Sequence, residues 1–168
     1  MANNCLYRMH AVAKNENALK RLVAIMNYRD AEYFIYRCFS AMVENTYEED
    51  GKFVYEITGD VAWSCVKWFE HEENAEEVLS DNGTAHYITL DLLCKRLGIA
   101  IELYSEECGM CFQEWYMCNH EGELTANESR DWMLIMEDED GNELDDPIEK
   151  GGFGGDYCVF GKANEIWG

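Results

Sequence analysis

The 168-residue sequence contains few positively charged residues. Thirteen lysines and arginines face 34 aspartates and glutamates, which gives a net charge of -21. Residues 1–100 hold 16 acids and 10 bases, a net charge of -6, whereas residues 101–168 hold 18 acids and 3 bases, a net charge of -15. Such a chain repels nucleic acid and anionic membranes and attracts basic surfaces. We therefore expect no direct nucleic-acid binding and a basic partner, and the interpretation that the charge serves solubility alone stays open.

The sequence also lacks the long apolar runs that membranes and export require. No run approaches the roughly 20 apolar residues of a membrane-spanning helix. The first twenty residues contain no basic head followed by a solid apolar stretch, which excludes a typical secretory signal. These absences predict a soluble intracellular protein without membrane contact, in which the eight cysteines are reduced thiols.

Recognisable catalytic motifs are missing as well. The chain has no Gly-x-Ser-x-Gly elbow, no phosphate-binding loop and no His-Glu-x-x-His pair. The four histidines lie in a strand or in polar turns, and 34 acids make any one pair of carboxylates uninformative. We therefore expect that the protein is not an enzyme and carries no cofactor.

A cysteine-rich stretch, ECGMCFQEWYMCNHEGEL, raises the question of zinc. Cys108 and Cys111 form one C-x2-C pair, but Cys118 and His120 are separated by a single residue, which seldom lets both face one metal. If 110–118 is a strand, Cys111 and Cys118 point to opposite faces and lie roughly 23 Å apart. The pattern therefore predicts buried or half-buried thiols and no zinc site.

An acidic segment near the C-terminus partly resembles a calcium-binding loop. DEDGNELDDPIE, residues 138–149, places oxygen-bearing side chains at positions 1, 3, 5, 9 and 12. Glu143 stands where such a loop needs glycine, and no helix is expected on either side. A small metal- or ligand-binding module that uses this loop or the cysteines is therefore the alternative function rather than the first one.

Local patterns predict two helices and several strands. The first helix, over residues 15–26, begins at the capping residue Asn15, and the second, over 89–97, begins at Thr89 and ends at Gly98. Each has one apolar stripe, so a single sheet face would cover it. Alternating segments predict strands at 3–13, on both sides of a turn at Asp50-Gly51, at 99–105, at 110–118 and at Tyr157–Phe160.

This order of elements predicts an α+β fold. We expect a ferredoxin-like βαββαβ antiparallel sheet with two helices on one face, extended by C-terminal strands and an acidic loop. The length predicts one domain over residues 1–168, with the core at 1–125 and an acidic, glycine-rich extension at 126–168.

The sequence also resembles a known family over about residues 1–125. The segments MANNCLYRMHAVA, EITGDVAWS, LDLLCKRLGIAIELYSEECGMCF and NHEGEL are similar to the ferredoxin-like domain of phage and plasmid proteins typified by YubB. Trp63-Ser64 at the end of a strand and the later GMCF element contribute to the likeness, although Cys65 replaces the family's usual proline. The resemblance implies this fold and a mobile genetic element in a bacterial host, and it implies no activity.

Charge and resemblance together predict a non-enzymatic phage or mobile-element protein that binds a basic, nucleic-acid-binding host protein in the bacterial cytoplasm. In its limiting form this is a nucleic-acid mimic that inhibits a defence nuclease, of the anti-CRISPR or anti-restriction type. Duplex DNA carries one charge per about 1.7 Å, so 21 charges match roughly 36 Å of duplex. The expected partner-binding residues form two acidic patches: Glu70, Glu72, Glu73, Glu76 and Glu77, and Glu137, Asp138, Glu139, Asp140, Glu143, Asp145 and Asp146.

Overall fold

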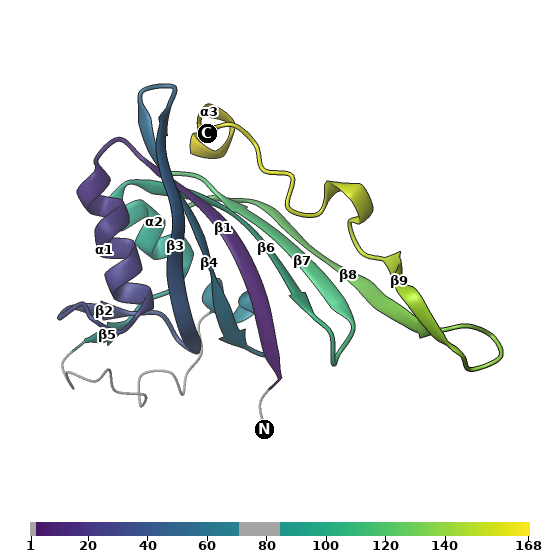
Figure 1. Cartoon of the computed structure of the whole chain (residues 1–168). Coiled ribbons are helices and arrows are strands. Elements are labelled where there is room, and N and C mark those ends of the chain that lie inside the picture. The colour runs from purple at the N-terminus through teal and green to yellow at the C-terminus, as the bar shows by residue number, and fades with distance from the viewer. Residues whose placement is uncertain (1–2, 71–84) are drawn as a thin grey trace.

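The computed structural model describes residues 3–70 and 85–168. Strands alternate with short helices along this part of the chain (Figure 1). The strands are β1 (Asn4–Ala13), β2 (Tyr33–Phe34), β3 (Cys38–Glu49), β4 (Lys52–Ala62), β5 (His86–Tyr87), β6 (Ile99–Glu107), β7 (Phe112–Cys118), β8 (Leu124–Glu137) and β9 (Glu143–Gly151). The helices are α1 (Glu16–Met26), α2 (Leu90–Leu97) and α3 (Ala163–Trp167), with 3-10 turns η1 (Cys65–Trp68) and η3 (Gly154–Asp156).

Seven of the strands form one curled antiparallel sheet in the order β3-β4-β1-β6-β7-β8-β9, and β2 and β5 form a small parallel pair. The predicted ferredoxin-like fold with two helices is therefore wrong. The sheet dominates the molecule, and the three helices have only 11, 8 and 5 residues. The prediction failed because it took β8 and β9 for an appendage, whereas β8 continues the same sheet beside β7.

The two sheet faces have separate cores. Alternating residues of β1, such as Tyr7 and Met9, pack with α1 and α2 on what we call the helical face. Val12 of the same strand packs on the opposite face with Val54, Ala163 and α3. We call this second face the C-terminal face, because residues 152–168 run across it (Figure 1).

Carboxyl and amide groups of the sheet fasten residues 152–168 to the C-terminal face. The backbone N–H groups of Phe153, Gly161 and Ala163 donate to the side chains of Gln113, Glu102 and Glu49, at 2.9, 2.7 and 2.7 Å. The strand predicted at Tyr157–Phe160 is wrong, because these residues have no strand conformation and pair with no strand among the residues that the structure describes. The N–H groups of Tyr157 and Val159 instead donate to the nearby carbonyls of Gly154 and Asp156, at 3.2 and 3.1 Å.

The local signals for helices and turns are confirmed. Asn15 caps α1 by accepting the N–H of Asn17 at 3.0 Å, and α2 ends at Gly98 in the left-handed conformation. Asp50 and Gly51 both have positive φ in the β3–β4 turn, as a tight hairpin requires. Within residues 3–70 and 85–168, no helix is long and apolar enough to cross a membrane.

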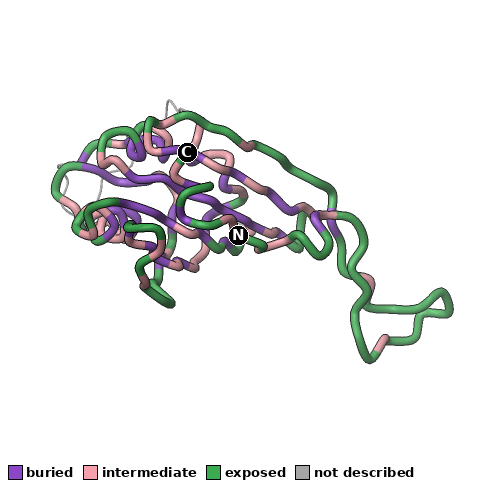
Figure 2. The backbone as a smooth tube through the Cα atoms, turned by 90° about the horizontal axis from the view of Figure 1, so that it is seen from above, coloured by how far each residue is buried: buried purple, intermediate pink, exposed green. Residues whose placement is uncertain are grey.

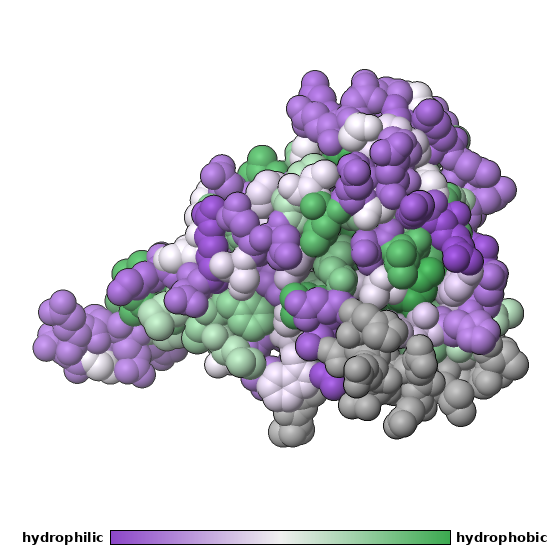
Figure 3. All heavy atoms as spheres, turned by 180° about the vertical axis from the view of Figure 1, so that it is seen from behind, coloured by the Kyte–Doolittle hydropathy of each residue, from purple (hydrophilic) through white to green (hydrophobic). Residues whose placement is uncertain are grey.

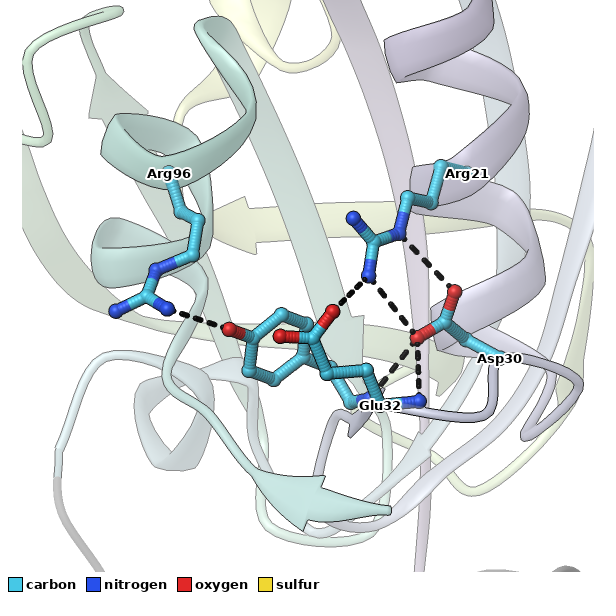
Figure 4. Close-up of polar contacts among 5 residues, drawn as sticks. Arg21, Asp30, Glu32 and Arg96 are labelled. Carbon is cyan, nitrogen blue, oxygen red and sulfur yellow. Dashed lines mark hydrogen bonds and ion pairs between the residues drawn. The ribbon is translucent and has the colours of Figure 1, made fainter.

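A polar cluster ties α1 to the loop before β2 and to α2. Arg21 donates to Asp30 at 3.1 Å and to Glu32 at 2.7 Å (Figure 4). Arg96 donates to the hydroxyl of Tyr33 at 2.5 Å, and both guanidinium groups lie 5.5 Å from the Tyr33 ring. Both arginines therefore have partners within the fold, so the cluster explains how the helices are held together and leaves no open anion site.

Asp30→Asn should remove part of the protein's sensitivity to acid. Burial raises the pKa of Asp30, but hydrogen bonds from Arg21 and from the backbone N–H groups of Tyr33 and Glu32 outweigh it and hold this pKa below its ordinary value. The resulting stabilisation is present above the ordinary pKa of about 3.9 and is lost as the pH falls through the folded-state pKa.

We expect Asp30→Asn to lower the free energy of unfolding by about 2 kcal/mol at neutral pH and to change it little in strong acid. Urea unfolding at both pH values measures this difference. Asp156→Asn is the control because Asp156 is exposed. Equal losses for Asp30→Asn at both pH values would contradict the assignment.

Candidate interaction surface

Strand β8 extends past the sheet and carries β9 with it. Residues 124–131 pair with β7, whereas Trp132 to Glu137 pair only with β9. We call residues 132–151 the arm. In Figure 1 the arm projects from the end of the sheet, and Figure 2 shows that most of its length is exposed.

Local hydrogen bonds shape the tip of the arm. The carboxylate of Asp138 accepts the N–H of Asp140 at 2.9 Å and that of Asn142 at 2.8 Å, and Gly141 supplies a positive φ. Hydrogen bonds from Asn142 are also the main reason that the pKa of Asp138 lies below its ordinary value. Asp138 therefore builds the turn, and the carboxylates around it are freer to meet a partner.

The chain's single proline is compatible with this hairpin. Pro147 lies in β9, which is the last strand of the sheet, so its missing N–H removes no bond to a further strand. The β8–β9 register also shifts between Ile135 and Glu137, beside the proline. Edge position and irregular register are the two settings in which a strand tolerates proline.

The arm combines negative charge with exposed apolar side chains. Eight carboxylates and one lysine give it a net charge of -7. Met133, Met136 and Ile148 are 44%, 48% and 54% exposed. Figure 3 shows the hydrophilic tip with hydrophobic side chains behind it. Because a lone two-stranded hairpin is at best marginally stable and exposed apolar groups mark contact sites, the arm is the strongest candidate for an interaction surface.

The structure brings one of the two predicted acidic patches together. It places on the arm Glu137, Asp138, Glu139, Asp140, Glu143, Asp145 and Asp146. Glu70 lies elsewhere, because its carbonyl accepts the hydroxyl of Tyr87 in the small sheet and its carboxylate lies 3.9 Å from Lys67. The remaining residues of that patch fall outside the described residues: Glu72, Glu73, Glu76 and Glu77.

The calcium-loop alternative does not fit the arm. Residues 143–151 form β9, so Asp146 and Glu149 lie along an extended strand instead of curling round a common centre. Asp138 already uses its carboxylate within the turn. The geometry therefore favours a surface of spread negative charge over a cation cage.

The cysteine-rich stretch is a hairpin rather than a cluster. Cys108 and Cys111 lie in the β6–β7 turn, whereas Cys118 is buried at the far end of β7. His120 stacks on Trp167 with ring centroids 4.3 Å apart, and its Nδ1 lies 2.8 Å from the Trp167 carbonyl. These residues do not surround one point, and the absence of zinc stays a prediction for elemental analysis.

A different group of potential ligands was missed by the sequence analysis. In the described residues, Cys5, Cys65 and Glu114 are buried with their ligand atoms within 4.8 Å of one another. Ser64 and Tyr116 donate to Oε1 of Glu114 at 2.5 and 2.8 Å. The sequence does contain one indication of this group, because Glu114 is an acidic residue between Phe112 and Tyr116 on the same face of a strand.

The other carboxylate oxygen of Glu114, Oε2, also accepts two hydrogen bonds. It accepts the N–H of Cys65 at 3.0 Å and the hydroxyl of Ser105 at 2.6 Å. Burial raises the pKa of the Cys65 thiol, which keeps it protonated at neutral pH. Each carboxylate oxygen therefore already has two strong donors, and the group is explained as a structural network that joins η1, β6 and β7.

Comparisons with protein-family models, curated proteins and solved structures found no match. The likeness to the YubB-type family therefore stays a prediction from the sequence.

Proposed function

We propose that the protein is a non-enzymatic binding protein of a phage or mobile element, acting in the cytoplasm of a bacterial host. It binds and blocks a basic, nucleic-acid-binding host protein, such as a nuclease of a CRISPR or restriction system. The observation that carries this proposal is the projecting arm, on which eight carboxylates and several exposed apolar side chains occur together.

The charge spacing of the arm supports mimicry of a single nucleic-acid strand more than of a duplex. The part of β8 that lies in the arm, Trp132 to Glu137, has six residues, which at about 3.4 Å each give a length of roughly 20 Å. A duplex of that length carries about 12 charges and one of its strands about 6. The net charge of -7 on the arm is closer to the single strand. We therefore expect a partner groove that accommodates one strand.

The exposed apolar side chains of the arm can also bury apolar surface against the partner, which the phosphate charges of a nucleic acid cannot do. Exposed charges mainly speed association and weaken with salt, whereas buried apolar area slows dissociation. Met133, Met136 and Ile148 are positioned to supply the second component, because they are exposed on the β8 and β9 strands that carry the acidic tip. High salt should therefore lower the association rate constant strongly and change the dissociation rate constant less, so that part of the affinity remains.

Neutralising the tip tests this proposal. The arm variant changes Glu139, Asp140, Glu143 and Asp145 to their amides and leaves Asp138, which builds the turn. The binding partner is the host protein that the wild-type protein captures from a bacterial lysate. We expect the affinity of the arm variant for this captured host protein to fall at least about tenfold at low salt and by less at high salt. Surface plasmon resonance at two salt concentrations measures both values.

A matched control makes the same change of charge away from the arm. It converts four exposed carboxylates to amides: Glu44, Glu48, Asp50 and Asp156. It should bind like the wild type, and a single-stranded oligonucleotide should compete with the protein for its partner. Equal losses for the two quadruple variants, or no competition, would overturn the proposal.

A further inference from the structure

The outer edge of β8 is open beside the base of the arm. On its inner side β8 pairs with β7 up to Asp131. On its outer side β9 covers β8 from Trp132 onward, and Gly152 also donates its N–H to the carbonyl of Asp131. After β9 the chain turns away, because Phe153 donates its N–H to Gln113 on the C-terminal face. Among the strands of residues 3–70 and 85–168, none pairs with the outer side of residues 126–131.

The direction of the backbone groups follows from two hydrogen bonds. The N–H of Trp132 donates inward to the carbonyl of Cys111 at 2.9 Å, and the carbonyl of Asp131 accepts outward from Gly152 at 2.8 Å. Inward and outward residues alternate along an antiparallel strand. Ser129 and Asn127 therefore present both their N–H and their C=O groups outward, and no strand of the described part of the chain receives them.

This edge is more regular than the opposite edge of the sheet. The pairing of β3 with β4 is interrupted by two register shifts, between Cys38 and Ser40 and between Val43 and Asn45. Such bulges discourage the addition of a further strand. Residues 126–131 pair with β7 without a shift, and the open part, residues 126–130, gives a regular edge about 17 Å long. Regular open edges are where extended peptides add as a further strand.

Charge decides what can occupy the edge. The arm lies at one end with a net charge of -7, and Glu121 and Glu123 lie in the turn at the other end. Arg130 adds little free positive charge, because it lies 2.8 Å from Glu128. A second copy would bring another chain of net charge -21 to the same edge. A basic segment meets the opposite charge instead.

We propose that residues 126–130 of β8 bind an extended, lysine- or arginine-rich segment of the partner protein by strand addition. The basic character of this segment rests on the proposed function. The contact itself rests on the open edge and on the outward backbone groups of Asn127 and Ser129. The segment would continue the line of β9, so that one partner contacts edge and arm together.

The first test uses two synthetic peptides, an eight-residue alternating Lys-Thr peptide and an alternating Glu-Thr peptide of equal length. Amide hydrogen exchange followed by NMR reports on Asn127 and Ser129 directly. We expect the Lys-Thr peptide at ten times its Kd to slow exchange of both amides about tenfold, since only the free protein exchanges them. The Glu-Thr peptide should leave them unchanged.

An oligolysine peptide with the same number of lysines separates charge from strand addition. If oligolysine binds without protecting the two amides and the Lys-Thr peptide protects them, the result agrees with the proposal. Binding of the Lys-Thr peptide without protection would overturn the proposal. Protection that arises instead from a dimer of the protein alone, seen by sedimentation, would also overturn it.

The second test removes one outward N–H. Ser129→Pro should weaken binding of the Lys-Thr peptide at least about tenfold, because proline cannot donate to an added strand. Ser129→Thr is the matched control, because it keeps the N–H and favours a strand. If Ser129→Pro fails to fold, a Lys-Thr peptide N-methylated at alternate residues tests the same bonds from the other side, and undiminished binding of that peptide would overturn the proposal.

The arm variant distinguishes this proposal from the proposed function. If neutralising the arm abolishes partner binding while Ser129→Pro leaves it intact, strand addition is wrong and the acidic surface still acts. If the peptide protects Asn127 and Ser129 but neutralising the arm has no effect on the captured partner, strand addition holds and the proposed function fails.

Discussion

Glu114→Ala is expected to lower the free energy of unfolding by about 3 kcal/mol or more, which would be among the largest effects of any single substitution in this protein. Glu114 is only 2% exposed, and its carboxylate accepts four strong hydrogen bonds from three separate parts of the chain. Alanine would remove the acceptor and leave the hydroxyl groups of Ser105 and Tyr116 and the N–H of Cys65 buried without it.

Glu114→Gln should lower the free energy of unfolding clearly less than Glu114→Ala does. Its amide oxygen can take the place of Oε2 and keep the bonds from Cys65 and Ser105. Its NH2 group can donate to Ser64 and Tyr116, whose hydroxyl groups can rotate to accept. The order of stability should therefore be wild type, then Gln, then Ala.

Urea unfolding followed by fluorescence measures this series. Glu149→Gln is the control, because Glu149 is an exposed glutamate in a strand and should change stability by less than about 0.5 kcal/mol. Elemental analysis of the same samples checks the alternative for this group. One zinc per chain, lost in Glu114→Ala, would show that the network is a metal site and that the explanation by hydrogen bonds is wrong.

The sequence predicts those parts of the fold whose signals are local. Asn15 and Gly98 bound helices within a few residues of their own positions, and Asp50-Gly51 forms its turn alone. The Glu137–Asp146 patch was predicted as an acidic loop, and the structure shows a hairpin arm. Its residues are adjacent in sequence, which is why charge alone could locate it.

The parts that could not be predicted depend on contacts between distant residues. Strand β8 has no buried face over most of its length, so its sequence lacks the alternation that marks a strand. Residues 157–160 alternate like a strand, yet Glu102 and Glu49 hold the segment to which they belong through its backbone N–H groups. No local pattern shows which side chains will supply those acceptors.

At Gly59 the strands β3 and β4 approach each other too closely for a side chain. A Cβ at this position would lie inside 3.0 Å of the carbonyl oxygen of Ser40 and of the Tyr7 hydroxyl, which themselves form a 2.7 Å hydrogen bond. The approach arises at the β-bulge between Cys38 and Ser40. Because the nearest obstacle is backbone, repacking of a flexible side chain cannot relieve it.

We therefore expect Gly59→Ala to lower the free energy of unfolding by about 3 kcal/mol, at the upper end of the usual cost of overpacking. Gly155→Ala is the matched control, because no atom lies within 4 Å of its added Cβ and its φ is not positive. This control should be neutral or slightly stabilising, since alanine restricts the unfolded chain. Thermal and urea unfolding of both variants measure the difference. Equal stability of Gly59→Ala and wild type would show that β3 can move away from β4 at the bulge, because only such a shift makes room for the methyl group.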